Sequence, residues 1–215
     1  EDEALALAVP MLLRIQSINA DIIGPYEVSR FYNELEIFSE WLIDKFLALR
    51  RPEFLNKTWD FLVAATQDQP MVPIHRDYHS RNILLRDKDQ IGIVDFQDAL
   101  IGPITYDLVS LLRDCYYQFP ETTVARWRKR FLSLSHCELS ELEFERAFDL
   151  TGVQRHLKAA GIFARLQLRY GRSSHLKEIV PTLRRVVAVA QSHEELHQIA
   201  KWIENKVIPA AERAT

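Results

Sequence analysis

The sequence predicts a mainly α-helical fold with one small β insertion. Apolar residues recur at helical spacing before residue 70 and again after Pro103. Between these segments, residues 71–96 contain three short strand-like runs, MVPI, NILLR and IGIVDF. The 215 residues include only six glycines, which argues against a large β-rich or loop-rich fold.

The N-terminal segment predicts three helices. The first covers residues 5–15 and contains Pro10, which must either kink the helix or mark its start. The second apolar stripe covers residues 35–49, and a third candidate covers residues 59–65. A Gly-Pro pair at residues 24–25 predicts a loop between the first two helices.

The β insertion is expected to contain a hairpin, because the polar turn Asp87–Gln90 separates its last two strands. After Pro103 the helical pattern resumes and continues through the rest of the chain. Two Ser-x-x-Glu patterns, which begin at Ser140 and Ser192, are capping boxes that are each expected to open a helix.

Composition argues against several functional classes. A net charge of −3 gives no reason to expect nucleic acid as a partner. No apolar run approaches the ~20 residues of a membrane span, and EDEALALAVP does not resemble a signal peptide. We therefore expect a cytoplasmic protein without a membrane partner. Cys115 and Cys137 stand in segments predicted to be helical and are expected to be reduced, mostly buried thiols.

Residues 75–95 contain most of the candidate chemistry. The loop HRDYHSRN has the H-x-D pattern of kinase catalytic loops, with Asn82 at the expected distance, and the strand IGIVDF then delivers Asp95. Phosphoryl transfer requires a carboxylate that accepts the proton of the attacking hydroxyl, and oxygen ligands for Mg²⁺. We therefore predict Asp77 as the catalytic base and Asn82 and Asp95 as magnesium ligands.

Three further residues are predicted to support this loop. His75 is expected to be structural rather than catalytic, and His79 to orient the loop through hydrogen bonds. Asp107 stands at the start of the predicted helix YDLVSLL. It can favour the helix N-terminus electrostatically or brace the catalytic loop, and the sequence leaves both readings open.

Two other functions compete with phosphoryl transfer. His75, Asp77 and His79 alternate along the chain, so on a strand they would share one face, as in a zinc hydrolase. That hypothesis leaves Asn82 and the IVDF strand without a role. A non-catalytic interaction module that has kept the motif is the other alternative.

HRDYHSRNILL followed by IGIVDFQDALIGPITYDLVSLL resembles the aminoglycoside phosphotransferase family of small-molecule kinases. Within that family the chain is most similar to bacterial kinases of cell-wall recycling that phosphorylate N-acetylmuramate and N-acetylglucosamine at the anomeric hydroxyl. The stretch VQRHLKAAGIFARLQLRYG also resembles this subgroup. The resemblance implies a protein-kinase-like fold, ATP as phosphoryl donor, Mg²⁺ as cofactor, and the roles assigned above to Asp77, Asn82 and Asp95.

A kinase of this kind also needs an N-terminal lobe with a glycine-rich loop and a strand-borne lysine. The six glycines are not clustered, and no such lysine precedes the catalytic loop. Residues 1–215 are therefore expected to be the C-terminal lobe, with residues 71–95 as its catalytic loop and metal-binding hairpin. The expected partner is the absent N-terminal lobe of the same polypeptide, and the chain alone is expected to be inactive.

The acceptor is expected to be a small molecule, because the segment between Asp95 and the helix at Asp107 is too short for the activation loop of a protein kinase. An arginine fork matches the lactyl carboxylate of N-acetylmuramate, so Arg155 and Lys158 in QRHLK are predicted acceptor contacts. A polycationic aminoglycoside would need acidic contacts, for which the candidates are Asp98 and Asp114. A neutral or anionic amino sugar is favoured over an aminoglycoside.

Overall fold

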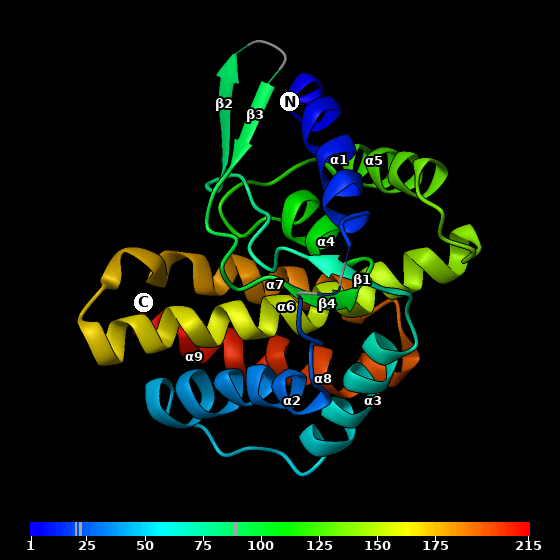
Figure 1. Ribbon diagram of the computed structural model, residues 1–215. Coiled ribbons are helices and arrows are strands. Elements are labelled where there is room, and N and C mark those ends of the chain that lie inside the picture. Colours follow the sequence, from blue (N-terminus) through cyan, green and yellow to red (C-terminus); the bar gives the residue numbers. More distant parts are fainter. Residues whose placement is uncertain (20, 22, 88–89) are drawn as a thin grey trace. The chain divides into compact units, whose positions relative to one another are not determined.

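The computed structural model describes residues 1–19, 21, 23–87 and 90–215. These residues form two compact units. Unit 1 contains residues 1–26 and 66–151, and unit 2 contains residues 27–65 and 152–215. The chain is mostly helical with small antiparallel sheets, as the sequence predicts (Figure 1).

Unit 1 begins with α1 (Asp2–Gln16) and also contains α4 (Tyr106–Leu112), α5 (Glu121–Leu134) and the first part of α6 (Glu141–Tyr170). Helix α1 runs through Pro10, so the proline does not mark a helix start. The proline lies on the exposed side of α1, where the loss of one backbone donor is less costly because water can solvate the freed carbonyl.

The core of unit 1 is formed by the apolar faces of these helices and by residues of the β insertion. Two of its rings, Phe131 of α5 and Phe144 of α6, stack with centroids 5.8 Å apart. Helix α4 is unusual because all seven of its residues are buried. Other buried members of this core include Leu5, Leu12, Tyr78, Leu108, Leu112 and Phe148.

The strands of unit 1 form two separate two-stranded antiparallel sheets (Figure 1). β1 (Met71–Ile74) pairs with β4 (Leu100–Pro103), and β2 (Ile83–Asp87) pairs with β3 (Gln90–Ile93). The three predicted strands and the hairpin pairing are confirmed, although residues 88–89 of the predicted turn lie outside the described residues. The sequence did not predict β4, because half of LIGP is a Gly-Pro pair, which is typical of turns.

Unit 2 contains only helical elements among its described residues. α2 (Val28–Ile37) continues directly into a π-helical segment, Phe38–Phe46, so the predicted second helix is present. Phe38 packs edge-on against Trp59 and Trp202, with ring centroids 6.1 and 6.4 Å apart. The remaining elements are α3 (Leu55–Gln67, to residue 65), the second part of α6, a 3-10 helix Ser173–Glu178, α7 (Ile179–Ala190), a 3-10 turn Glu194–Leu196, α8 (His197–Trp202), a π-helical segment Ile203–Val207 and α9 (Ile208–Ala214).

A close backbone approach in unit 2 requires a glycine. A Cβ atom added at Gly161 of α6 would lie 2.5 Å from the carbonyl oxygen of Ile37 and 2.7 Å from the Cα of Phe38. Both atoms belong to the backbone, so no side-chain rotation can relieve the clash. Gly161 therefore lets α6 pack directly against the junction of α2 with the π-helical segment.

Two of the local sequence predictions have different outcomes. The Ser140–Glu143 capping box is confirmed, because the Ser140 amide donates to Glu143 Oε2 at 2.8 Å and the Glu143 amide donates to Ser140 Oγ at 3.3 Å. The box at Ser192 is wrong. Its amide donates to the carbonyl of Val189 in the turn that ends α7, and the next helical turn begins at Glu194.

Cys115 and Cys137 are free thiols, as expected, but both are of intermediate burial and not mostly buried. Their predicted helical location is wrong, because they lie in the segments after α4 and after α5. None of the described helices combines the length and apolar character needed to cross a membrane.

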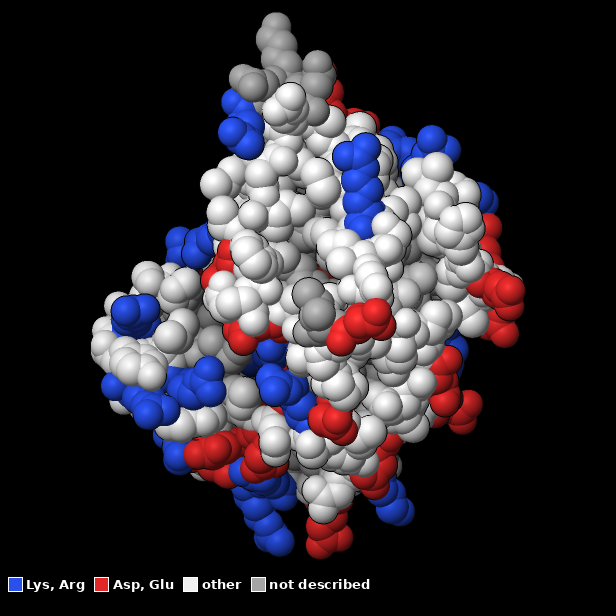
Figure 2. All heavy atoms as spheres, in the orientation of Figure 1, with Lys and Arg blue, Asp and Glu red and all other residues white. Residues whose placement is uncertain are grey.

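The surface over the β2–β3 hairpin and the segment after it carries few charges (Figure 2). The exposed apolar side chains there are Leu84 and Leu85 of β2, and Val94 and Phe96 after β3. Val94 and Phe96 flank Asp95, the predicted metal ligand at the end of the hairpin.

Candidate active site

The loop between β1 and β2 brings the predicted base and one predicted metal ligand together. The Asn82 side-chain amide donates to the backbone carbonyl of Asp77 at 3.0 Å, and the His79 amide donates to the same carbonyl at 3.0 Å. The Asn82 backbone amide donates to the His79 carbonyl at 2.9 Å. Because the Asn82 nitrogen is used in this way, its Oδ1 remains available as an oxygen ligand.

The β2–β3 hairpin brings the second predicted metal ligand to the same place. The Val94 amide, one residue before Asp95, donates to the Asn82 carbonyl at 3.1 Å. Asp95 is exposed and has a φ of +71°, a left-handed conformation that costs a non-glycine residue ~1–3 kcal/mol and is concentrated at functional sites. Its Oδ1 accepts a hydrogen bond from Gln97 Nε2 at 2.7 Å.

Asp107 braces the start of the catalytic loop. Its Oδ2 accepts the His75 amide at 2.5 Å and its Oδ1 accepts the Arg76 amide at 2.9 Å. The carboxylate is 0% exposed, and Arg76 has a φ of +75°. Asp107 also stands in the first turn of α4, so one carboxylate can favour the helix N-terminus and brace the loop at the same time. The carboxylate holds a strained backbone turn directly before Asp77.

A second acid, Asp114, holds the other half of the loop. Its Oδ2 accepts the Ser80 amide at 2.9 Å and the Ser80 hydroxyl at 2.5 Å, and its Oδ1 accepts the Tyr116 amide at 2.8 Å. Asp114 is 2% exposed. Its reading as a contact for a cationic acceptor is therefore wrong, because the side chain is buried and bonded to the loop. No local pattern could have revealed this role, since Ser80 is 34 residues away in the chain.

The two histidines lie inside this network. His75 is buried, and its Nδ1 accepts the Asp77 amide at 3.3 Å. The His79 ring meets the Tyr116 ring edge-on, with centroids 5.5 Å apart. Among the described residues, no group of three His, Cys, Asp or Glu side chains could hold a metal ion. His75, Asp77 and His79, the ligands that a zinc hydrolase would use, therefore do not form such a group.

Two tyrosines that sequence reasoning missed also position the loop. The Tyr78 hydroxyl donates to the carbonyl of Ala8 in α1 at 2.8 Å, and burial, followed by the Asp107 charge, raises the pKa of this phenol. The Tyr116 ring lies under the Arg81 guanidinium, whose carbon is 3.5 Å from the ring centroid. Burial raises the pKa of Tyr116, while the Arg81 cation opposes that effect.

Comparison with known proteins identifies the family. Residues 1–148 match the phosphotransferase enzyme family, and this range includes Asp77, Asn82, Asp95 and their supporting residues. The chain belongs to this family. The resemblance expected from the sequence is confirmed.

Two curated proteins are similar over most of this chain. An N-acetylmuramate/N-acetylglucosamine kinase of Pseudomonas aeruginosa is 33% identical over 212 residues, which cover 94% of this chain and 62% of that protein. An N-acetylmuramate/N-acetylglucosamine kinase of Neisseria meningitidis serogroup B is 37% identical over 200 residues, which cover 88% of this chain and 59% of that protein. This chain therefore spans about three fifths of the length of these relatives.

A solved structure supports a shared fold. The ethanolamine kinase of Plasmodium vivax superposes with a TM-score of 0.63 at 14% identity, and the match covers 88% of this chain and 60% of that chain. At this identity, the similarity bears on the fold alone. The kinase-like architecture expected from the sequence agrees with it.

The predicted acceptor contacts of this phosphotransferase chain lie in both units. Asp98 of unit 1 is exposed, and its backbone carbonyl accepts a hydrogen bond from Arg76 Nη1 at 3.4 Å. Arg155 and Lys158 lie on α6 in unit 2. The Lys158 ammonium donates to Glu34 Oε1 at 2.7 Å, and both side chains are largely buried. Lys158 is thus paired within unit 2, and the acceptor roles of Asp98, Arg155 and Lys158 stay predictions.

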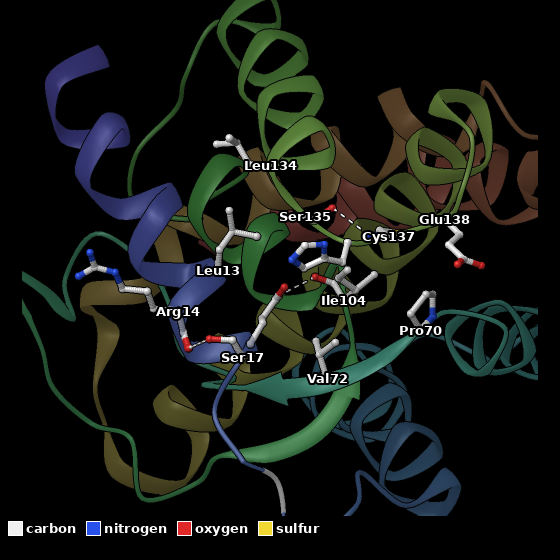
Figure 3. A pocket seen from close by; sticks show the side chains of 12 residues that line it. Leu13, Arg14, Ser17, Pro70, Val72, Ile104, Leu134, Ser135, Cys137 and Glu138 are labelled. Carbon is white, nitrogen blue, oxygen red and sulfur yellow. Dashed lines mark hydrogen bonds between the residues drawn. The ribbon is translucent and has the colours of Figure 1, made fainter.

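Unit 1 of the phosphotransferase chain also contains a cavity of about 620 Å³. Figure 3 shows Leu13, Val72 and Ile104 around it, with the charged Arg14 and Glu138 at its edges. None of the predicted catalytic or metal-binding residues lines this cavity. It is therefore separate from the candidate active site.

Proposed function

We propose that this chain carries the catalytic loop of an ATP-dependent, cytoplasmic kinase that phosphorylates the anomeric hydroxyl of N-acetylmuramate or N-acetylglucosamine. The observation that carries the proposal is the hydrogen bonding of Asn82 to the Asp77 carbonyl and to the Val94 amide. These contacts join a base, an amide ligand and the end of the strand before Asp95. The choice of sugar is supported by the names of the two curated relatives.

In this proposal Asp77 accepts the proton of the sugar hydroxyl. Its side chain is partly exposed, so an acceptor can reach it. Its backbone is held on both sides, because its amide donates to His75 Nδ1 and its carbonyl accepts from Asn82 Nδ2. A base that is fixed in this way needs little reorganisation when the hydroxyl approaches.

The donor set at Asn82 and Asp95 fits Mg²⁺. An amide oxygen and a carboxylate are hard ligands of the kind this ion prefers, and the hydrogen bond from Asn82 Nδ2 leaves Oδ1 free to serve. A bound magnesium ion would supply charge neutralisation at the phosphates of the donor. The exposed position of Asp95 leaves room for the nucleotide and water that complete such a site.

A neutral or anionic sugar fits unit 1 better than an aminoglycoside does. A polycationic acceptor needs accessible carboxylates near the base, and Asp114 is buried among hydrogen bonds to the loop. Asp98 alone of the two candidate acids is exposed.

The test uses the full-length protein with ATP, Mg²⁺ and each sugar, with the product followed by ³¹P NMR. A phosphate coupled to the anomeric carbon is expected. Asp77→Asn should lower kcat about 10²–10⁴-fold, because it removes the general base, while Asp68→Asn, an exposed carboxylate of the same unit, should leave kcat unchanged. Turnover of kanamycin but of neither sugar would contradict the proposed acceptor. Unchanged kcat in Asp77→Asn would remove this residue from the mechanism.

A further inference from the structure

Arg81 lies in the catalytic loop, directly before the predicted metal ligand Asn82 and four residues after Asp77. It is an exposed residue, and its guanidinium carbon lies 3.5 Å from the centroid of the Tyr116 ring. Within residues 1–19, 21, 23–86 and 90–215, its side chain makes no hydrogen bond and no ion pair. A cation thus lies beside a candidate phosphoryl-transfer site with no carboxylate partner in the described chain.

Stacking on an aromatic ring restrains a guanidinium without using its donors. The ring covers one face of the planar group, whereas the five N–H bonds point outward in the plane. Arg81 therefore keeps its hydrogen-bonding edge available while its position is restrained. Two parallel N–H groups on such an edge match the two oxygens of a carboxylate or a phosphate.

Tyr116 is itself held firmly, so the restraint on Arg81 extends to the buried part of unit 1. The Tyr116 amide donates to Asp114, and Asp114 also accepts the amide and the hydroxyl of Ser80, the neighbour of Arg81. The His79 ring contacts the Tyr116 ring edge-on. His79 and Arg81, the neighbours of Ser80, thus both contact Tyr116. These contacts fix Arg81 relative to the loop.

We propose that Arg81 is an oxyanion-binding residue of the active site and that Tyr116 is the residue that positions it. This inference rests on the proposed function, which provides two oxyanions close to the loop. One is the polyphosphate of the nucleotide donor, and the other is the carboxylate of an acidic acceptor sugar. The same guanidinium edge can bind either group, so the experiment distinguishes them.

The test measures binding by calorimetry, which does not depend on turnover. The full-length protein and the variant Arg81→Gln are titrated with ATP, adenosine, N-acetylmuramate and N-acetylglucosamine. If Arg81 binds donor phosphates, affinity for ATP should fall about 10- to 100-fold while affinity for adenosine is kept. If it binds the acceptor carboxylate, the same loss should appear for N-acetylmuramate and be absent for N-acetylglucosamine.

Three further variants separate positioning from a general charge effect. Tyr116→Leu should reproduce part of the affinity loss, whereas Tyr116→Phe keeps the ring face and should restore affinity close to that of the parent. Arg130→Gln removes an exposed arginine of α5 and should change neither affinity. Each variant is checked for parental thermal unfolding before titration.

Parental affinity of Arg81→Gln for both ATP and N-acetylmuramate would overturn the inference, as would an equal loss in Arg130→Gln. Full affinity in Tyr116→Leu would overturn the role of the tyrosine. The proposed function fails separately, if the parent protein binds these ligands but phosphorylates neither sugar.

Discussion

Replacement of Asp107 by Asn tests whether the strained turn before Asp77 is held by a buried carboxylate. In the parent, two backbone amides donate to the two oxygens of one charged group, at 2.5 and 2.9 Å. The substitution keeps the shape of the side chain but leaves one oxygen acceptor. The second backbone amide then faces an NH₂ group in a site that is 0% exposed.

The expected cost follows from these contacts. Each hydrogen bond to a charged group contributes ~1.5–3 kcal/mol, and a neutral one contributes ~1 kcal/mol. Exchange of two charged bonds for one neutral bond therefore costs about 2–5 kcal/mol. The left-handed backbone of Arg76 costs ~1–3 kcal/mol. The one remaining neutral hydrogen bond contributes only ~1 kcal/mol, which does not offset the full range of this strain. We expect the turn to relax and to displace Asp77, which follows it.

The assay pairs thermal unfolding with steady-state kinetics in the full-length protein. Asp107→Asn should lower Tm, at about 2–4 °C for each kcal/mol lost, and should lower kcat at least about tenfold, because a displaced base is a poor catalyst. Asp68→Asn is the matched control, since it makes the same chemical change at an exposed position. Parental kcat in Asp107→Asn would refute the bracing role, and a lower Tm with parental kcat would assign Asp107 to stability alone.

Three other predictions concern the metal, the fold and the acceptor. Asp95→Ala should abolish activity at every Mg²⁺ concentration, whereas Asn82→Ala should be partly rescued by high Mg²⁺, because only a neutral ligand is lost; the same Mg²⁺ dependence in both variants would contradict these roles. Gly161→Ala should destabilise the protein by ~1–3 kcal/mol in chemical denaturation, because the new Cβ lies 2.5 Å from a backbone atom. Gly24→Ala is the control, since its new Cβ meets no atom within 4 Å. A more stable Gly161→Ala variant would show that helix propensity outweighs the clash. Arg155→Ala should reduce kcat/KM for N-acetylmuramate more than for N-acetylglucosamine, and an equal reduction would exclude carboxylate recognition by this residue.

Short-range patterns were sufficient to predict most helical segments and the hairpin, and they identify a set of candidate site residues that lie close together. Asp77 and Asn82 are five residues apart, and the β2–β3 pairing brings the chain back so that Val94 bonds to Asn82. A motif whose members are joined by one loop and one hairpin can be recognised without knowledge of the rest of the fold. The helical stripes were visible for the same reason, since their periodicity is local.

The supporting residues of the site could not be predicted in this way. Asp114 bonds to a residue 34 positions earlier, and Tyr78 bonds to the Ala8 carbonyl 70 positions earlier. Neither contact leaves a periodic signal in the sequence. The partner of Lys158 was equally hidden, because Glu34, which accepts its hydrogen bond, lies 124 positions away. Tertiary packing alone shows which charges are already paired.

The antiparallel pairing of β2 with β3 separates the distance between Asn82 and Asp95 in space from the number of residues between them along the chain. Ile83, next to Asn82, pairs with Ile93, two residues before Asp95, at the base of the hairpin. The spacing of the two predicted ligands is therefore set by a single rung of the ladder and is independent of how many residues lie between them. A change in the number of residues within the hairpin that keeps this pair in register should therefore leave the two predicted ligands at the same separation.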